Sequence, residues 1–328
     1  MPRIVITRAV PESTLTHLQE ALPNAELWVN PDPANLSNEE LIAHAKGADA
    51  LLCTLADKLD SATLDAIAGN LKVIATYAVG TNNIDLAHAS FLNIAVANTP
   101  DVLTDASAEI AIALILATAR RVVEGDQMVR QDRFTGWAPL LHLGHGVFGK
   151  TIGIVGAGRI GQRVGRSMAL GFDCKVLYTS RNDKADFEAA CGARRVPLEE
   201  LLAESDVVSL HCPLTEDTYY LLNTARIELM KPNAILVNTA RGPVVDEEAL
   251  VDALKRGVIA GAGLDVYEDE PALKPGLASL PNVVLLPHIG SATYEAREAM
   301  GQLCANAFID VLAGKAPSNL ANEWRSGA

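Results

Sequence analysis

Aromatic residues and positive charge are both scarce in this sequence of 328 residues. Phe, Trp and Tyr make up only 5% of the chain, and 27 basic residues stand against 40 acidic ones, which gives a formal net charge of −13 at pH 7. Nucleic-acid binding relies on basic clusters and, for single strands, on aromatic stacking surfaces, so no nucleic-acid partner is expected. A small molecule or another protein remains as the partner.

Cysteine is also sparse, and its spacing excludes two common uses. An odd number of cysteines without a CxxC pair fits neither a disulfide framework nor a zinc site. His142 and His145 lack a third ligand-type residue at ligand spacing. We therefore expect free thiols, no bound metal and a cytoplasmic location. The five cysteines are Cys53, Cys174, Cys191, Cys212 and Cys304.

Long apolar runs are absent as well. The most apolar segment, residues 106–119, contains Glu109 and is shorter than the roughly 20 residues that a bilayer requires. The N-terminus has the strand-like run Ile4-Val5-Ile6 where a signal peptide would place a charged stub and an apolar core. The sequence thus predicts no membrane segment and no signal peptide.

What the chain does have is a regular alternation of short β-type runs and amphipathic helical stretches, which predicts parallel sheets. The first predicted series of strands lies at 3–7, 25–29, 50–54, 71–75 and 94–96. The second lies at 151–155, 175–178, 206–211, 234–238, 261–266 and 283–286. Six strands in series are typical of a doubly wound sheet. A capping box, Ser37 with Glu40, predicts the start of one helix in the first series.

Two segments link these series. A helix is predicted over 105–122, followed by an extended, glycine-rich loop to Gly149 that would connect domains or subunits. A final helix, about 293–312, could return to pack on the first series. The predicted domains are therefore a discontinuous one, 1–99 with 291–328, and a continuous one, 100–290.

The strongest local motif is the run Gly156-Ala157-Gly158-Arg159-Ile160-Gly161. It follows an apolar strand and opens an amphipathic helix, which is the context that makes this motif indicative of dinucleotide binding. Gly156 would allow the tight turn, Gly158 the approach of a pyrophosphate, and Gly161 close packing of helix on strand. The N–H groups at the start of the helix would face the anion.

The end of the next strand indicates which dinucleotide is preferred. NAD-binding folds place an acidic residue there to hold the ribose hydroxyls, but this sequence has Ser180 and Arg181. A hydroxyl and a guanidinium suit a 2′-phosphate, so NADP(H) is favoured over NAD(H), which remains possible. The alternative is that Arg181 is a solvated loop residue and Asp183 turns back onto the ribose.

Three polar residues stand at the ends of later strands, where ligands of open parallel sheets bind. They are Arg241, Asp265 and His288. An arginine fork can hold the carboxylate of a 2-oxo acid, and a histidine can protonate the carbonyl oxygen when hydride arrives. Glu270, placed on the far ring nitrogen, would fix the tautomer of that histidine.

Several motifs in fixed order then resemble a known family. They are the glycine run 156–161, Asn238-Thr239-Ala240-Arg241-Gly242, Gly263-Leu264-Asp265-Val266, Asp269-Glu270-Pro271 and Pro287-His288-Ile289-Gly290-Ser291-Ala292. The chain resembles the D-isomer-specific 2-hydroxyacid dehydrogenases end to end. Within that family it is most similar to glyoxylate and hydroxypyruvate reductases, on the runs 77–85, 98–104 and 178–181.

The resemblance implies a fold and a site. The fold is two doubly wound parallel-sheet domains, a Rossmann cofactor domain and a smaller flavodoxin-like substrate or lid domain, with the active site in the cleft between them. Arg241 would bind substrate, His288 would be the acid/base with Glu270 as its partner, and the backbone at Val79 and Gly80 would help hold the substrate carboxylate. The cofactor would meet Thr104, the residues of the glycine run with Arg159 and Ile160, Ser180, Arg181, Cys212, Pro213, Asn238, Thr239, Ala240, Asp265, His288 and Gly290.

The resemblance also implies a homodimer, in which the loop between the domains forms an arm and Trp137 reaches the partner's pocket. The expected activity is NADPH-preferring reduction of glyoxylate to glycolate and of hydroxypyruvate to D-glycerate. Two alternatives stay open: a relative acting on D-lactate, phenylpyruvate or 3-phosphoglycerate types of substrate, and a dinucleotide-sensing scaffold of the corepressor type.

Overall fold

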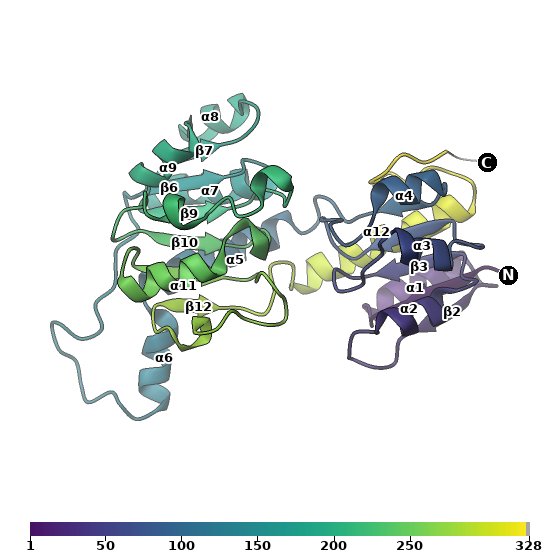
Figure 1. Cartoon of the computed structure of the whole chain (residues 1–328), viewed down its shortest axis with the longest axis horizontal. Helices are drawn as coiled ribbons and strands as arrows, with labels where there is room; N and C mark the ends of the chain where they lie inside the picture. The colour runs from purple at the N-terminus through teal and green to yellow at the C-terminus, as the bar shows by residue number, and fades with distance from the viewer. Residues whose placement is uncertain (326–328) are drawn as a thin grey trace. The chain divides into compact units, whose positions relative to one another are not determined.

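The computed structural model describes residues 1–325 and divides into two compact units (Figure 1). One unit contains Met1–Leu103 and the segment that begins at Ala292, and the other is Thr104–Ser291. Each unit has one sheet, and its strands pair in parallel throughout. The predicted fold class, two parallel-sheet α/β domains, is therefore confirmed.

The smaller unit has a five-stranded sheet in the order β2-β1-β3-β4-β5, the flavodoxin-like order. Its strands are β1 (Arg3–Ile6), β2 (Glu26–Val29), β3 (Ala50–Cys53), β4 (Val73–Thr76) and β5 (Ala95–Ala97). Its helices are α1 (Glu12–Ala21), α2 (Asn38–Ala45), α3 (Ser61–Ile67), α4 (Leu86–Phe91) and α12 (Tyr294–Leu312).

Successive apolar side chains along the strands of the smaller unit point to opposite faces of its sheet, so helices pack on both faces. Ile4 and Ile6 pack with residues of α1 and α12, whereas Val5 between them packs with residues of α2 and α3. The predicted capping box is present, since Ser37 and the side chain of Glu40 satisfy each other's backbone N–H groups at the start of α2.

The larger unit has a seven-stranded sheet in the order β12-β11-β10-β9-β6-β7-β8. Counted within the unit this is the Rossmann order, 3-2-1-4-5-6, with a further strand at the end. Its strands are β6 (Thr151–Val155), β7 (Lys175–Thr179), β8 (Arg194–Arg195), β9 (Val207–Leu210), β10 (Ile235–Asn238), β11 (Gly261–Leu264) and β12 (Val283–Leu285).

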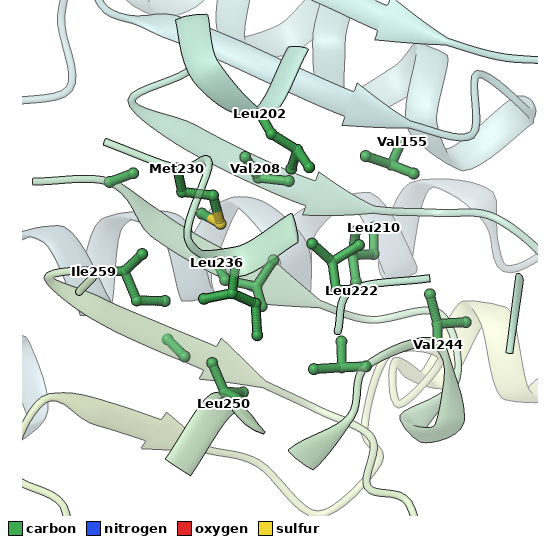
Figure 2. Close-up of a cluster of buried hydrophobic side chains, with 14 of the residues drawn as sticks. Val155, Leu202, Val208, Leu210, Leu222, Met230, Leu236, Val244, Leu250 and Ile259 are labelled. Carbon is green, nitrogen blue, oxygen red and sulfur yellow. The ribbon is translucent and has the colours of Figure 1, made fainter. Parts of the chain in front are cut away.

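Two layers of helices cover the sheet of the larger unit. Its helices are α5 (Thr104–Ala119), α6 (Val122–Arg130), α7 (Arg159–Phe172), α8 (Ala185–Cys191), α9 (Leu198–Glu204), α10 (Thr224–Ile227) and α11 (Glu247–Arg256), with short 3₁₀ turns η1 (Glu216–Thr218), η2 (Gly242–Val244) and η3 (Leu277–Ser279). Figure 2 shows part of the core on one face, a single cluster of buried side chains to which Leu202, Leu236 and Leu250 belong. Each such fully buried side chain contributes about 1.5–3 kcal/mol.

The structure differs from the sequence-based expectation at two places in the larger unit. The sheet has seven strands and not six, because the two-residue β8 pairs with Leu177–Tyr178 of β7. The helix predicted over 105–122 ends at Ala119, and a separate helix begins after Arg121, whose φ of 55° is left-handed. The helix α6 and the loop that follows it extend away from the sheet of their unit (Figure 1). No helix within residues 1–325 is long and apolar enough to cross a bilayer.

Candidate functional site

The predicted strand-end residues lie at one edge of the larger sheet. Arg241 follows β10, Asp265 follows β11 directly, and His288 lies three residues after β12. These strands are neighbours and run parallel, so their carboxyl ends meet at one edge, where ligands of open α/β sheets bind.

His288 and Glu270 form a hydrogen-bonded pair, with Nδ1 of the ring 2.8 Å from Oε2 of the carboxylate. Their side chains are 34% and 35% exposed, so the pair is accessible from outside the protein. Burial alone raises the pKa of Glu270, but the hydrogen bond and charge of His288, the Tyr267 N–H and the charge of Arg241 outweigh burial and hold it below its usual range. The carboxylate is therefore charged and fixes which ring nitrogen faces away from it.

Arg241 stands at the end of a turn that Asn238 holds. The buried amide of Asn238 accepts from the Ala240 N–H at 3.0 Å and donates to the Arg241 carbonyl oxygen at 2.9 Å. Burial lowers the pKa of Arg241 while the charge of Glu270 raises it, and a guanidinium still keeps its proton near neutral pH. The site therefore combines a fixed cation with the imidazole and carboxylate.

Asp265 anchors the backbone just after His288. Its Oδ1 accepts from the Ile289 N–H and its Oδ2 from the Gly290 N–H, each at 2.7 Å, and the residue is 1% exposed. His288 itself has a left-handed φ of 54°, which is unfavourable for a non-glycine residue. The two charge-assisted hydrogen bonds compensate that cost and fix the direction of the histidine. This role was not foreseen from the sequence.

Gly242, next to Arg241, belongs to one of the ordered motifs, but its structural role was not foreseen either. A Cβ at this position would overlap the backbone of Tyr267 and Glu268. The turn that carries Arg241 therefore packs directly against the turn that carries Glu270, and the contact requires a residue without a side chain. Sequence reasoning can find such a residue only when it can tell which backbone segments touch.

The glycine run adopts the arrangement that dinucleotide binding requires. Gly156 has a left-handed φ of 95°, and a Cβ on Gly161 would overlap the carbonyl oxygen of Gly156, so helix α7 lies close against β6. A Cβ on Gly158, by contrast, would meet no atom within 4 Å. The backbone at Gly158 is thus open to an approaching ligand, at the N-terminus of a 14-residue helix.

Other predicted cofactor residues surround the same edge. Thr104 begins α5, and Arg159 and Ile160 begin α7. Cys212 and Pro213 follow β9, and the backbone of Cys212 packs against Gly156. Within residues 1–325 the buried hydroxyl of Thr239 has no hydrogen-bond partner, which marks a polar atom that a ligand could satisfy. These residues fit a nicotinamide dinucleotide.

The loop after β7 carries Ser180 and Arg181, and β8 supports it. The guanidinium of Arg195 donates to the carbonyl oxygens of Ser180 and Arg181, at 2.8 and 3.1 Å, and pairs with Asp183 at 2.7 Å. Asp183 is therefore already engaged by a cation. Arg195 was missed at the sequence level because β8 has no apolar pattern.

Val79 and Gly80 belong to the smaller unit, in the loop after β4. The side chain of Asn98 donates to the Val79 carbonyl oxygen at 2.8 Å, which braces this loop, and Val79 is 39% exposed. Trp137 lies in the loop after α6 and is 83% exposed.

The contacts of Cys212 and His142 do not favour a thiol nucleophile or a metal site at these residues. Burial raises the pKa of the Cys212 thiol to about 11, and the ring Nε2 of the adjacent His211 lies 2.8 Å from Ser209 Oγ. His142 Nε2 contacts the Arg121 carbonyl oxygen. In the described part of the chain, no three His, Cys, Asp or Glu residues cluster as metal ligands.

Comparison with known proteins connects this arrangement to a family. Residues 112–290 match the model of the D-isomer specific 2-hydroxyacid dehydrogenase, NAD binding domain. The chain is 50% identical over 325 residues to a glyoxylate reductase of Thermococcus onnurineus, an alignment that covers 98% of this chain and 96% of that protein.

Solved structures agree with this match. A Thermus thermophilus protein superposes with a TM-score of 0.90 at 44% identity, over 97% of this chain and 99% of that one. A Sinorhizobium meliloti NADPH-dependent glyoxylate/hydroxypyruvate reductase, solved with NADP and malonate, superposes with a TM-score of 0.86 at 32% identity, over 100% and 99%. The resemblance seen in the ordered motifs is thereby confirmed, and the chain belongs to the D-isomer-specific 2-hydroxyacid dehydrogenase family of oxidoreductases.

Proposed function

We propose that this chain is an NADP(H)-preferring reductase of small 2-oxo acids, which converts glyoxylate to glycolate and hydroxypyruvate to D-glycerate. The observation that carries the proposal is the 2.8 Å His288–Glu270 pair beside Arg241 at the carboxyl edge of a sheet with a dinucleotide-binding glycine run. The similarity to glyoxylate reductases over 98% of the chain supports the choice of substrate.

Each residue of the trio has a distinct task. Arg241 holds the substrate carboxylate with its planar fork and places the neighbouring carbonyl beside His288. When bound, a reduced nicotinamide would supply the hydride that this reduction requires. His288 donates a proton to the carbonyl oxygen, so that the 2-oxo acid becomes a 2-hydroxy acid, and Glu270 stabilises the charged imidazolium before the transfer.

The cofactor would be held by the glycine run, with backbone N–H groups at the start of α7 on the pyrophosphate and Gly158 giving it room. Thr104, Cys212 and Pro213 would line its pocket. Asn238, Thr239, Ala240, Asp265 and Gly290 would lie along the ribose and nicotinamide.

Preference for NADP(H) rests on Ser180 and Arg181. The adjacent Arg195 adds positive charge to this loop and engages Asp183, which reduces the repulsion that a 2′-phosphate would meet there. The alternative, in which Asp183 binds the ribose and NAD(H) is used equally, predicts no loss of discrimination when Arg181 is removed.

The larger unit would serve as the cofactor domain and the smaller one as the substrate or lid domain. Backbone N–H groups at Val79 and Gly80 would help to hold the substrate carboxylate. The chain would form a homodimer through the arm that contains Trp137, whose indole would reach the partner's pocket. All five cysteines are free thiols, which supports a cytoplasmic location.

The proposal is tested by following the absorbance of NADPH with glyoxylate, hydroxypyruvate, pyruvate and phenylpyruvate as substrates, each repeated with NADH. We expect oxidation of NADPH with the two small acids and its loss in His288→Ala. A folded protein that binds NADPH but reduces none of the four acids would refute the enzyme and favour a dinucleotide-sensing scaffold. Faster turnover of pyruvate or phenylpyruvate would assign another substrate within the family.

A further inference from the structure

The carboxylate of Glu270 depends on the short turn from Tyr267 to Pro271 for its position. Its Oε2 contacts His288, and its Oε1 accepts from the backbone N–H of Tyr267 at 2.9 Å. Glu270 therefore stays in place only if the backbone of this turn is itself held.

A second carboxyl group, that of Glu247, holds the backbone of this turn through a hydrogen bond. Glu247 is the first residue of α11 and is 2% exposed. Its Oε1 accepts from the Glu268 N–H at 2.6 Å, and its own N–H points back to Oε2 of Glu268 at 3.4 Å. Within residues 1–325 its Oε2 has no hydrogen-bond partner. Burial raises the pKa of this carboxyl group, so it is placed at a cost in free energy.

The side chain of Glu268 is fixed as well, and it is only 9% exposed. The Tyr220 hydroxyl donates to its Oε1 at 2.6 Å, and the Lys274 ammonium lies 3.0 Å from the same oxygen. The residue two positions before Glu270 is thus tied by its backbone to Glu247 and by its side chain to Tyr220 and Lys274.

We propose that Glu247 is a positioning residue for Glu270: its buried carboxyl oxygen holds the Glu268 backbone and so sets the turn that presents the Glu270 carboxylate to His288. For stability alone a buried acid is a costly choice here, because burial outweighs the favourable charge of Lys274 on this carboxyl group. This inference rests on the proposed role of Glu270.

The consequence for catalysis follows from geometry. If the turn relaxes, the distance between Glu270 and His288 increases and the imidazolium loses its nearest negative charge. Reduction requires a protonated ring, so we expect a variant with a relaxed turn to reduce substrate more slowly, most of all at higher pH. Displacements of about 1 Å at a reacting group can cost up to a hundredfold in rate.

Two conservative variants of Glu247 separate the effect of side-chain length from the effect of charge. Glu247→Gln keeps an acceptor oxygen at the same distance but loses the charge, whereas Glu247→Asp keeps the charge but shortens the side chain by one methylene. We expect Gln to retain kcat within about threefold, and Asp to lower kcat about tenfold and shift the pH profile of reduction toward acid. KM for NADPH should change little. The matched controls are Glu248→Gln and Glu248→Asp, at the exposed neighbour in the same helical turn. They should leave kcat and the pH profile unchanged.

A double-mutant cycle decides whether Glu247 acts through Glu270. In a Glu270→Gln background, Glu247→Asp should have little further effect on kcat, because the two changes disable the same contact. Full additivity of the two effects, or an impaired Gln variant beside an active Asp variant, would overturn the inference while leaving the proposed function intact. If Glu270→Gln alone alters neither kcat nor the pH profile, the proposed role of Glu270 fails, and the inference fails with it.

Discussion

At the scale of single residues, the site depends on His288 being held in an unfavourable backbone conformation. Its φ of 54° is stabilised by Asp265, whose two oxygens each accept a backbone N–H just beyond it. The sequence predicted that Asp265 and His288 stand at the ends of successive strands, but hydrogen bonds between two loops depend on how the strands are ordered in the sheet. The pair of hydrogen bonds to Asp265 can therefore be recognised only in the tertiary structure.

Glu270→Gln should shift the pH profile of 2-oxo acid reduction toward acid and lower kcat. The carboxylate lies 2.8 Å from the ring, and Glu270→Gln removes the negative charge that would stabilise the imidazolium proton donor, so the rate should fall off at a lower pH than in the wild type. The measurement is kcat against pH, with Glu248→Gln as control, since Glu248 is exposed on α11 and outside this turn. An unshifted profile would remove Glu270 from the mechanism.

Arg181→Ala should raise KM for NADPH by about tenfold or more and leave KM for NADH nearly unchanged. A charge-assisted hydrogen bond to the 2′-phosphate, worth about 1.5–3 kcal/mol, exists only with NADPH. Steady-state kinetics with both cofactors test this, and Arg194→Ala, on the same short strand as Arg195 but paired with Glu200 and Glu204, is the control. Equal effects on the two cofactors would contradict the assignment.

At the scale of elements, the sequence predicted the strands and helices that carry apolar periodicity and missed those that do not. Strand β6 was predicted with its observed bounds, because Ile152, Ile154 and Val155 give it an apolar run and Gly156 follows it directly. Strand β8 consists of two exposed arginines and is recognisable only by its pairing with β7. The break between α5 and α6 at Arg121 has no glycine or proline to signal it.

The glycines between β6 and α7 allow a prediction that separates an effect on NADPH binding from an effect on stability. Gly158→Ala should leave the melting temperature nearly unchanged but weaken NADPH binding, because its methyl group would point into open space where the backbone meets the ligand.

Gly161→Ala, three residues further along the same element, should instead lower the stability by about 1–3 kcal/mol, because its methyl group would overlap the Gly156 carbonyl oxygen. Thermal melts and fluorescence titration with NADPH distinguish the two variants. A stability loss in Gly158→Ala equal to that of Gly161→Ala would contradict this reading of the glycine run.

At the scale of the whole molecule, exposed apolar side chains gather on one projecting part of the chain. The helix α6 and the loop after it expose Val122, Val129, Phe134, Trp137, Leu140 and Leu143. Monomeric proteins rarely expose so many large apolar groups together, so this arm is the part of the surface where a second copy would pack.

The protein should therefore measure as a dimer in solution, and Val129→Asp should convert it to a monomer by placing a charge in the apolar contact. The control is Phe91→Asp, an equally drastic change at a residue of the smaller unit that is 82% exposed. Light scattering after size exclusion gives the mass. A monomeric wild type, or dimers of unchanged affinity in Val129→Asp, would remove the arm from the assembly.

The sequence by itself determined the fold class and marked the glycine run, because periodicity and turn chemistry are local properties of the chain. It predicted Arg241, Glu270 and His288 from strand ends together with the order of the motifs that resemble the family. Only the tertiary structure decided what holds those residues in place. Three contacts join segments that are distant in sequence. Asp265 accepts a backbone N–H of the His288 loop, Gly242 packs against the Tyr267 backbone, and Glu247 accepts the Glu268 N–H. Such contacts depend on which loops the sheet order brings together, and residue type alone does not reveal them.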